Sequence, residues 1–202
     1  MKPNKLSIAI TGGIGSGKSE VCRLLSEQNI PVISADKLGH QALANQKIKK
    51  QLVEEFGEQI MINGEIDHNL LGNIVFKDEL KILKLNKIIH PEIFRMLHRE
   101  LIDQKAELTA YEIPLLFEAG LEKLFDIIIM IWASVEVRSD RLLRRPGMTE
   151  LKIDEIMAQQ YSQVDAKAKS HYIIENNGSM EDMEKALKEV LKEIELDMEE
   201  RK

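Results

Sequence analysis

The stretch that decides the fold is LSIAITGGIGSGKS, which runs from Leu6 to Ser19. Residues 6–11 form a continuous, mostly apolar run, which predicts a strand buried on both faces of a parallel sheet. Residues 12–19 match the phosphate-binding pattern G-x-x-x-x-G-K-[ST] at every fixed position. Helical spacing begins at Ser19, so the sequence has the strand–loop–helix order that this pattern requires.

The residue types of this loop suit a nucleoside triphosphate. Glycines allow positive φ values and let the backbone approach a ligand closely, and successive amides form a nest for an anion. The positive N-terminal end of the following helix adds to this attraction. Lys18 is expected to reach the β- and γ-phosphates, and the Ser19 hydroxyl is expected to hold Mg²⁺, which makes ATP and Mg²⁺ the expected cofactors. The predicted nucleotide-binding residues of the loop are Gly13, Ile14, Gly15, Ser16, Gly17, Lys18, Ser19 and Glu20.

Strand-like and helical segments alternate along the rest of the chain. Residues 127–132 form a second buried apolar run, and the shorter strand candidates are residues 32–34, 109–113 and 172–174. Helical spacing is clearest in residues 19–27, 48–56, 79–89, 91–104, 136–145 and 180–199, with the pair His90-Pro91 expected to end one helix and start the next. This alternation predicts an α/β fold, with helices covering a mostly parallel sheet in a three-layer α/β/α arrangement.

The spacing of the strands indicates two insertions in this core. About sixty residues without a strand candidate separate the second strand from the third, far more than a short connection needs. Residues 46–106 are therefore expected to form a helical lobe with substrate contacts. The polar residues 146–170 suit a mobile lid, which leaves residues 1–45, 107–145 and 171–202 as the nucleotide-binding core.

Composition narrows the partners and the compartment. The 202 residues carry 28 Lys and Arg against 34 Asp and Glu, a net charge of −6, which argues against a nucleic-acid or membrane-surface binder. The longest apolar run has seven residues, whereas a membrane span needs about 20. Cys22 is the single cysteine and cannot form an intramolecular disulfide. We expect a cytoplasmic protein that is a monomer or a small homo-oligomer.

Two acidic residues follow predicted strands at the edge that carries the phosphate loop. Asp36 comes just after residues 32–34, and its carboxylate is placed to accept a proton from an acceptor hydroxyl or to hold a metal-bound water. The alternative role of Asp36 is to cap the following helix. Glu118 comes shortly after the third strand and is a candidate to orient metal or substrate, with a plain surface glutamate as the alternative.

Basic residues supply further candidates. Arg138, Arg141 and Arg145 share one helix face, and we expect Arg141 and Arg145 to close over the triphosphate and neutralise charge as the phosphoryl group moves. A solvated basic face is the alternative. His90 is a candidate for contact with the acceptor, with a structural histidine equally compatible with its position.

The phosphate loop indicates that a nucleoside triphosphate binds, but it does not indicate which reaction the protein catalyses. A GTPase usually carries N-K-x-D, whereas the Asn86-Lys87 pair here is followed by two isoleucines. A motor-type ATPase usually ends a buried strand with an acid, whereas residues 127–132 end in Trp132. A small kinase with a soluble acceptor therefore fits best. The motifs do not identify the acceptor, and several nucleosides or nucleotides fit that role. A nucleotide-gated binding module is the alternative from a different functional class of protein.

An ordered set of landmarks resembles the dephospho-CoA kinase family. The landmarks are Thr11 to Ser19, Ala35-Asp36, His90-Pro91, Pro114 to Glu118, Arg141 with Arg145, and Ile174 to Gly178. The resemblance implies a P-loop kinase core and ATP-dependent phosphorylation of the ribose 3′-hydroxyl of dephospho-CoA, which gives CoA and ADP in the last step of CoA biosynthesis.

The resemblance also implies roles for individual residues. Asp36 becomes the catalytic base, Lys18 the phosphate clamp, and Arg141 and Arg145 the lid arginines, while Asn176 and Gly178 lie near the adenine. The chain departs from the family at a few positions: Glu20 stands where Thr is common, Ser34 where a first Asp is frequent, and Arg138 where Gln is common. Ser170-His171 replaces a usual Ala-Asp.

Overall fold

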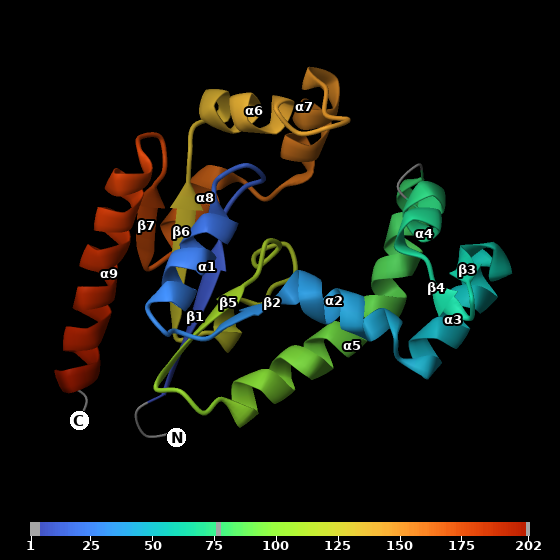
Figure 1. The fold of residues 1–202 in the computed structure, drawn as a ribbon, viewed down its shortest axis with the longest axis horizontal. Helices are drawn as coiled ribbons and strands as arrows, with labels where there is room; N and C mark the ends of the chain where they lie inside the picture. Colours follow the sequence, from blue (N-terminus) through green and yellow to red (C-terminus); the bar gives the residue numbers. More distant parts are fainter. Residues whose placement is uncertain (1–4, 76–77, 201–202) are drawn as a thin grey trace. The chain divides into compact units, whose positions relative to one another are not determined.

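The computed structural model describes residues 5–75 and 78–200, which divide into two compact units. The first unit comprises the residues up to Ile33 and those from Lys105 onward; the second is Ser34–Gln104. Helices and strands of the first unit, with β2 at the boundary, are β1 Leu6–Thr11, α1 Lys18–Glu27, β2 Val32–Ser34, β5 Leu108–Glu112, β6 Ile127–Trp132, α6 Val135–Leu143, α7 Glu150–Gln159, α8 Gln163–Lys169, β7 Tyr172–Glu175 and α9 Met180–Glu200, with a 3-10 turn η2 at Glu122–Leu124 (Figure 1). Those of the second are α2 Ala35–Leu43, α3 Gln46–Phe56, a 3-10 turn η1 Glu58–Ile60, β3 Met61–Ile62, β4 Glu65–Ile66, α4 His68–Val75 and α5 Glu79–Asp103.

The central sheet has the strand order β2-β5-β1-β6-β7. The β1 strand is parallel to both of its neighbours, β5 and β6, and β6 is parallel to β7. Ile10 is paired with Glu112, and Trp132 with Glu175, so these four strands end at one edge of the sheet. The chain leaves β1 at the middle of this edge, which is where open α/β sheets bind their ligands.

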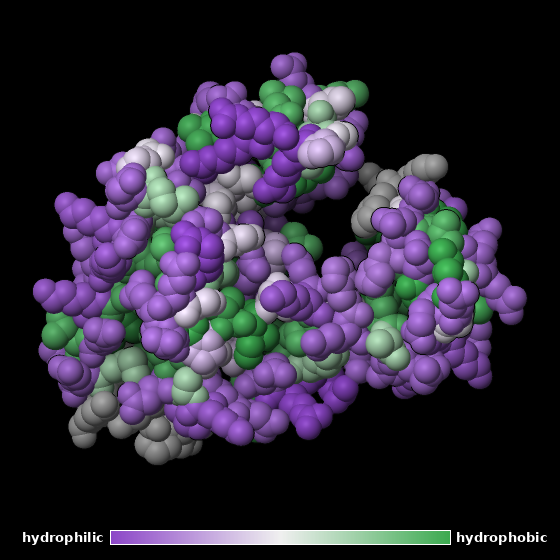
Figure 2. Space-filling model, in the orientation of Figure 1, coloured by the Kyte–Doolittle hydropathy of each residue, from purple (hydrophilic) through white to green (hydrophobic). Residues whose placement is uncertain are grey.

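Two helices cover one face of the sheet. Apolar residues of α1 and α9 form one buried cluster with β1, β5, β6 and β7. In α9 the buried residues Met183, Leu187, Leu191 and Ile194 follow the spacing that the sequence predicted. Each such aliphatic side chain contributes about 1.5–3 kcal/mol when fully buried. Figure 1 shows α9 beside β7, and in Figure 2 the visible outer side of α9 is largely hydrophilic.

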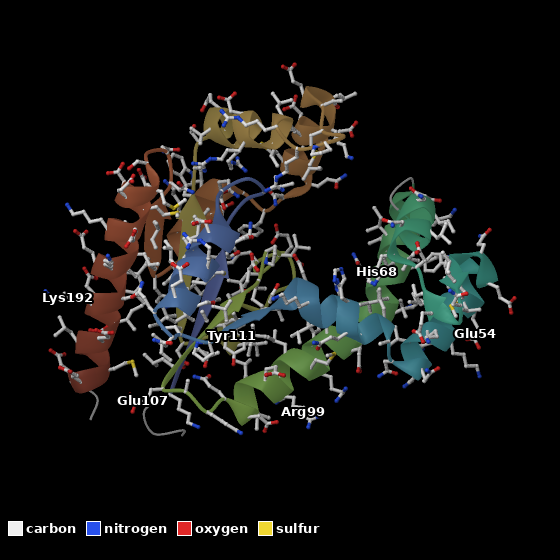
Figure 3. The ribbon with its side chains drawn as sticks, viewed as in Figure 1. Glu54, His68, Arg99, Glu107, Tyr111 and Lys192 are labelled. Atoms are coloured by element: carbon white, nitrogen blue, oxygen red, sulfur yellow. The ribbon has the colours of Figure 1, made fainter. Side chains whose placement is uncertain are left out.

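The opposite face is also covered. Met130 of β6 lies with Phe117 and with Ala166 of α8 around a small gap. Tyr111 of β5, labelled in Figure 3, is fully buried, and its ring centroid lies 5.4 Å from that of Phe125. Burial on both faces explains why β1 and β6 are continuous apolar runs, and it confirms the predicted three-layer α/β/α core.

The second unit is mainly helical. Residues of α2, α3 and α4 pack with α5 around a separate apolar core, in which Leu52, Ile60 and Val75 are fully buried. A short hairpin joins β3 to β4 through Asn63 and Gly64, both with positive φ. An Asn-Gly pair suits such a turn because these two residues tolerate that conformation best.

The helix α5 corrects one expectation. It is continuous from Glu79 to Asp103 with Pro91 inside it, so the expected break at His90-Pro91 is wrong. A proline removes one helical hydrogen bond. Buried side chains lie on both sides of it, Ile89 before and Leu97 after, and their packing holds the helix together.

The polar residues 146–170 contain two helices, α7 and α8, that the sequence analysis did not assign. Their N-termini are capped by Thr149 and Ser162, whose side chains accept hydrogen bonds from the amides of Lys152 and Asp165. The functional division into core, acceptor lobe and lid stays a prediction. Within residues 5–75 and 78–200, no helix combines the length and apolar character needed to cross a membrane.

Candidate active site

The phosphate-binding loop connects β1 to α1 at the carboxyl edge of the sheet. Thr11 ends β1, and α1 begins at Lys18. Because β5, β6 and β7 end at the same edge, the residues that follow those strands gather around the loop. These residues come from three well-separated parts of the chain, and all belong to the first unit.

Two glycines shape the loop. Gly12 has a φ of 145°, and a Cβ at this position would lie 2.2 Å from the carbonyl oxygen of Ile131. Gly17 has a φ of 101°, and a Cβ there would lie 2.2 Å from Nδ2 of Asn176. Both positions combine a backbone conformation that L side chains rarely adopt with a neighbour that leaves no room for one. Glycine is therefore required at both positions for the loop to pack against β6 and against Asn176.

The cation of Lys18 lies over the loop. Its Nζ donates hydrogen bonds to the carbonyl oxygens of Gly12, at 2.8 Å, and Gly13, at 3.1 Å. The buried hydroxyl of Ser16 has no hydrogen-bond partner among the described residues. A buried polar atom of this kind calls for a partner that the protein itself does not supply. The ammonium, the free hydroxyl and the glycine backbone together fit a phosphate chain.

A glutamate lies next to the predicted magnesium ligand. The Ser19 hydroxyl donates a hydrogen bond of 3.1 Å to Oε1 of Glu112, the last residue of β5. Hydroxyl and carboxylate oxygens are ligands that suit Mg²⁺, which commonly combines one or two protein groups with phosphates and waters. In the described parts of the chain no cluster of three or more His, Cys, Asp or Glu side chains could hold a metal alone. Ser19 and Glu112 therefore fit a metal that is shared with a nucleotide.

The sequence predicts a role for Glu118 but none for Glu112. The available signal was an acidic residue at the end of a strand, one residue before Ile113-Pro114, but the strand was placed one residue too late. In the structure Glu118 is exposed, and its Oε1 accepts a 2.8 Å hydrogen bond from the amide of Tyr161. Glu118 therefore holds the segment between α7 and α8, and its role in substrate binding stays a prediction.

Asn176 connects the loop to an arginine of α6. Its Nδ2 donates a 2.8 Å hydrogen bond to the carbonyl oxygen of Ser16, and its Oδ1 accepts a 3.1 Å hydrogen bond from Arg141. Arg141 also lies 3.5 Å from the carbonyl oxygen of Gly15. Asn176 is buried, and it follows β7 directly. The expected nucleotide contact and the expected lid arginine are thus joined in one network.

A cavity of about 240 Å³ opens beside this network. It is lined by residues of the loop, of α1, of α6 and of the segment after β7, namely Gly15, Gly17, Glu20, Arg141, Arg145, Asn176, Gly178 and Met180. Glu20 accepts a 2.8 Å hydrogen bond from Nε of Arg23. The structure therefore brings together the candidate residues Glu20, Arg141, Arg145, Asn176 and Gly178. The cavity is open to solvent and has both polar and apolar walls.

Arg138 is buried, which the sequence did not predict. Its side chain is only 4% exposed, and its Nε has no hydrogen-bond partner among the described residues. Burial lowers the pKa of Arg138 from its usual value. Oε1 of Gln160 lies, like Arg138, beside Gly13, and it accepts a 3.0 Å hydrogen bond from the amide of Ile14.

Asp36 and His90 belong to the second unit. Asp36 is the second residue of α2 and is exposed, while the capping position is taken by Ser34, so the alternative role of Asp36 as a helix cap is wrong. His90 is half-buried in α5, and its ring centroid lies 5.6 Å from that of Phe94. Burial lowers the pKa of His90, which favours the neutral imidazole. The roles expected for both residues stay predictions.

Comparison with known families decides the assignment. A family model described as dephospho-CoA kinase matches residues 6–182, which include the phosphate loop and Asn176. The chain belongs to the dephospho-CoA kinase family. A dephospho-CoA kinase from Bacillus licheniformis is 36% identical to it over 192 residues, covering 92% of this chain and 95% of that protein.

Solved structures share the fold of this chain. A crystal structure of TT1252 from Thermus thermophilus superimposes with a TM-score of 0.80 at 35% identity, covering 94% of this chain and 98% of that one. A shikimate kinase from Acinetobacter baumannii has a TM-score of 0.57 at 16% identity, covering 96% of both chains. This second likeness shows only a shared fold.

Proposed function

We propose that the protein transfers the γ-phosphoryl group of ATP to the ribose 3′-hydroxyl of dephospho-CoA, forming CoA and ADP. The observation that carries the proposal is the family match over residues 6–182 together with a complete phosphate loop. The transfer forms one bond to the γ-phosphorus and breaks another. The acceptor oxygen forms a new bond to the γ-phosphorus, the bond from that phosphorus to the bridging oxygen of ADP breaks, and the hydroxyl proton leaves to a base.

Residues of the first unit bind and polarise the phosphates. The loop amides and the positive end of α1 face the anion, and Lys18 supplies a cation next to Gly12 and Gly13. Arg141 and Arg145 line the cavity beside the loop and add positive charge where negative charge spreads during transfer. Positioning and electrostatic stabilisation of this kind account for most of the catalysis in phosphoryl transfer.

Ser19 and Glu112 would hold Mg²⁺ in this proposal. Bound there, the ion would neutralise phosphate charge and orient the β- and γ-phosphates. The Ser19 hydroxyl would be the direct ligand, and Glu112 would orient that hydroxyl or a metal-bound water. Both residues are anchored on ordered elements, α1 and β5, which keeps their oxygen atoms in place.

In this proposal Asp36 is the base that accepts the proton of the acceptor hydroxyl. Its carboxylate is exposed in the first turn of α2. The Ala35-Asp36 pair also stands in the family's order between the phosphate loop and His90-Pro91. In the same proposal residues 46–106 bind the acceptor and residues 146–170 act as the lid.

An acceptor panel tests the function. Purified protein is incubated with Mg²⁺ and ATP and with dephospho-CoA, adenosine, AMP or phosphopantetheine, and each acceptor is analysed by mass spectrometry for one added phosphoryl group. We expect gain on dephospho-CoA alone, and loss of that gain in the Lys18→Ala variant.

Each other outcome has a definite meaning. Phosphorylation of adenosine or AMP in place of dephospho-CoA would indicate a nucleoside or nucleotide kinase. Slow loss of ATP that is independent of every acceptor would indicate a nucleotide-gated binding module. Near-normal turnover by Lys18→Ala would show that the phosphate loop has been wrongly assigned.

A further inference from the structure

A buried arginine without an acidic partner lies against the phosphate loop. Arg138 of α6 is 4% exposed, which is unusual for a charged side chain unless a carboxylate is beside it. No ion pair of Arg138 occurs among the described residues, and its Nε has no hydrogen-bond partner there. The fold therefore places a mostly buried positive charge at this point with no carboxylate beside it, a costly arrangement in the absence of an anion.

The guanidinium group of Arg138 lies against Gly13, in the first half of the phosphate loop. A Cβ built on Gly13 would come within 2.4 Å of one terminal nitrogen of Arg138. A Cβ on Gly15 would lie 3.1 Å from the carbonyl oxygen of Arg138 and 3.3 Å from its Cβ. The residue thus touches the loop at two points, with its charged end at Gly13.

An anion in the loop would supply the missing counter-charge. The loop residues next to Arg138 are those whose backbone is shaped to approach phosphates, and Lys18 lies on the neighbouring carbonyl groups. Charges interact strongly where water is excluded. A bound triphosphate carries more negative charge than a diphosphate, so it gains more from this fixed cation.

We propose that Arg138 is a positioning residue that holds the loop at Gly13 and Gly15 and provides a fixed counter-charge that favours triphosphate over diphosphate binding. The inference rests on the proposed function, because it takes the loop to be the ATP site. Arg138→Gln removes the charge and keeps a long polar side chain, so we expect the fold to accept this substitution.

Binding measurements without acceptor test the proposal. The dissociation constants of a non-hydrolysable β,γ-imido analogue of ATP and of ADP are measured with Mg²⁺ by calorimetry. For Arg138→Gln we expect the Kd of the analogue to rise about ten-fold and that of ADP about three-fold. Arg138→Lys keeps the charge, and we expect it to stay within about three-fold of the wild type for both ligands.

A matched control removes the same charge elsewhere. Lys188 is an exposed residue of α9 whose partner is Glu184. Lys188→Gln is expected to leave both dissociation constants within about two-fold, because its charge is screened by solvent. The unfolding temperature of the unliganded Arg138→Gln protein is expected to be equal to or above that of the wild type, since an uncompensated buried charge has been removed.

Several results would overturn the proposal. Arg138→Gln could bind the analogue as tightly as the wild type, or lose ADP and analogue equally. Arg138→Lys could lose as much affinity as Arg138→Gln, which would assign the effect to shape. A fall of more than about 5 °C in the unfolding temperature of unliganded Arg138→Gln would make Arg138 a structural support. Failure of the wild type to bind the analogue would instead overturn the proposed function, and this inference with it.

Discussion

Asn176 lies directly against Gly17 of the phosphate loop, although the two residues lie far apart in the chain. A Cβ on Gly17 would come within 2.2 Å of Nδ2 of Asn176, the same atom that donates a hydrogen bond to the carbonyl oxygen of Ser16. The end of β7 therefore fixes the loop from outside, and the loop in turn requires glycine at position 17. This mutual constraint makes residue 17 a sensitive point for both stability and binding.

Substitution of Gly17 by alanine tests this contact. Gly17→Ala places a side chain at a φ of 101° and against Asn176, so we expect a loss of at least ~1 kcal/mol in the free energy of unfolding. We also expect the affinity for ATP to fall at least ten-fold, because Asn176 must move. Gly120→Ala is the control, since Gly120 also has a positive φ but no atom within 4 Å of its Cβ position. Equal loss of ATP affinity in both variants would contradict the proposed contact.

Replacement of Asp36 by asparagine tests the proposed base. Asp36→Asn removes the proton acceptor but keeps the shape of the side chain. We expect kcat with dephospho-CoA to fall by about 10²–10⁴-fold, while the Kd of the ATP analogue stays within about two-fold. Asp197→Asn, at an exposed site of α9, serves as the control. Should affinity fall while kcat holds, Asp36 would be a binding residue and not the base.

The pair Ser19 and Glu112 predicts a particular dependence on magnesium. We expect Glu112→Gln to raise the Mg²⁺ concentration for half-maximal rate about ten-fold, because it weakens the group that orients the Ser19 hydroxyl. Ser19→Ala is expected to have a larger effect. The rate is measured as a function of Mg²⁺ at saturating ATP and dephospho-CoA. Glu189→Gln on the exposed side of α9 is the control, and an unchanged magnesium curve for Glu112→Gln would remove Glu112 from the site.

The reactivity of the Cys22 thiol tests whether this side chain is buried in the core. Burial raises the pKa of the Cys22 thiol to about 12, and the nearby Glu112 acts in the same direction. At pH 8 the folded protein therefore contains very little thiolate, and we expect iodoacetamide to leave Cys22 unmodified until denaturant is added. Mass spectrometry of the native and the denatured protein measures this. Rapid alkylation of the native protein would show that Cys22 is accessible.

The raised pKa of the Cys22 thiol also determines how the free energy of unfolding changes at alkaline pH. Below pH 9 the thiol is protonated in both the folded and the unfolded chain, so its contribution does not change with pH. Between pH 9 and about 12 the unfolded chain releases the proton while the folded chain retains it. Rising pH in this window therefore favours unfolding through Cys22, and Cys22→Ala is expected to show a weaker decline in unfolding free energy.

Much of the core was predictable because its signals are local. The β1 and β6 strands are apolar throughout since both sheet faces are buried, and residues 6–11 and 127–132 match the observed bounds. The phosphate loop was predictable because its glycines, lysine and serine stand at fixed spacing. The helices α7 and α8 were not assigned, because a polar, solvated helix lacks a clear apolar face.

Other features depend on distant contacts and could not be predicted from local patterns. The burial of Arg138 results from the packing of α6 against the loop, and the pairing of Ser19 with Glu112 depends on β5 lying beside β1. The continuity of α5 through Pro91 depends on apolar packing before and after the proline. The hairpin at Asn63-Gly64 did carry a local signal, and its two-residue strands were simply too short to stand out.

The strand order has a consequence for synthesis on the ribosome. The β1 strand and its loop emerge first, but β7 and Asn176, which complete the cavity beside the loop, are translated late. A nascent chain that ends before residue 176 holds the glycine loop without the wall that fixes it. Truncated translation products therefore lack a finished cavity at this edge of the sheet.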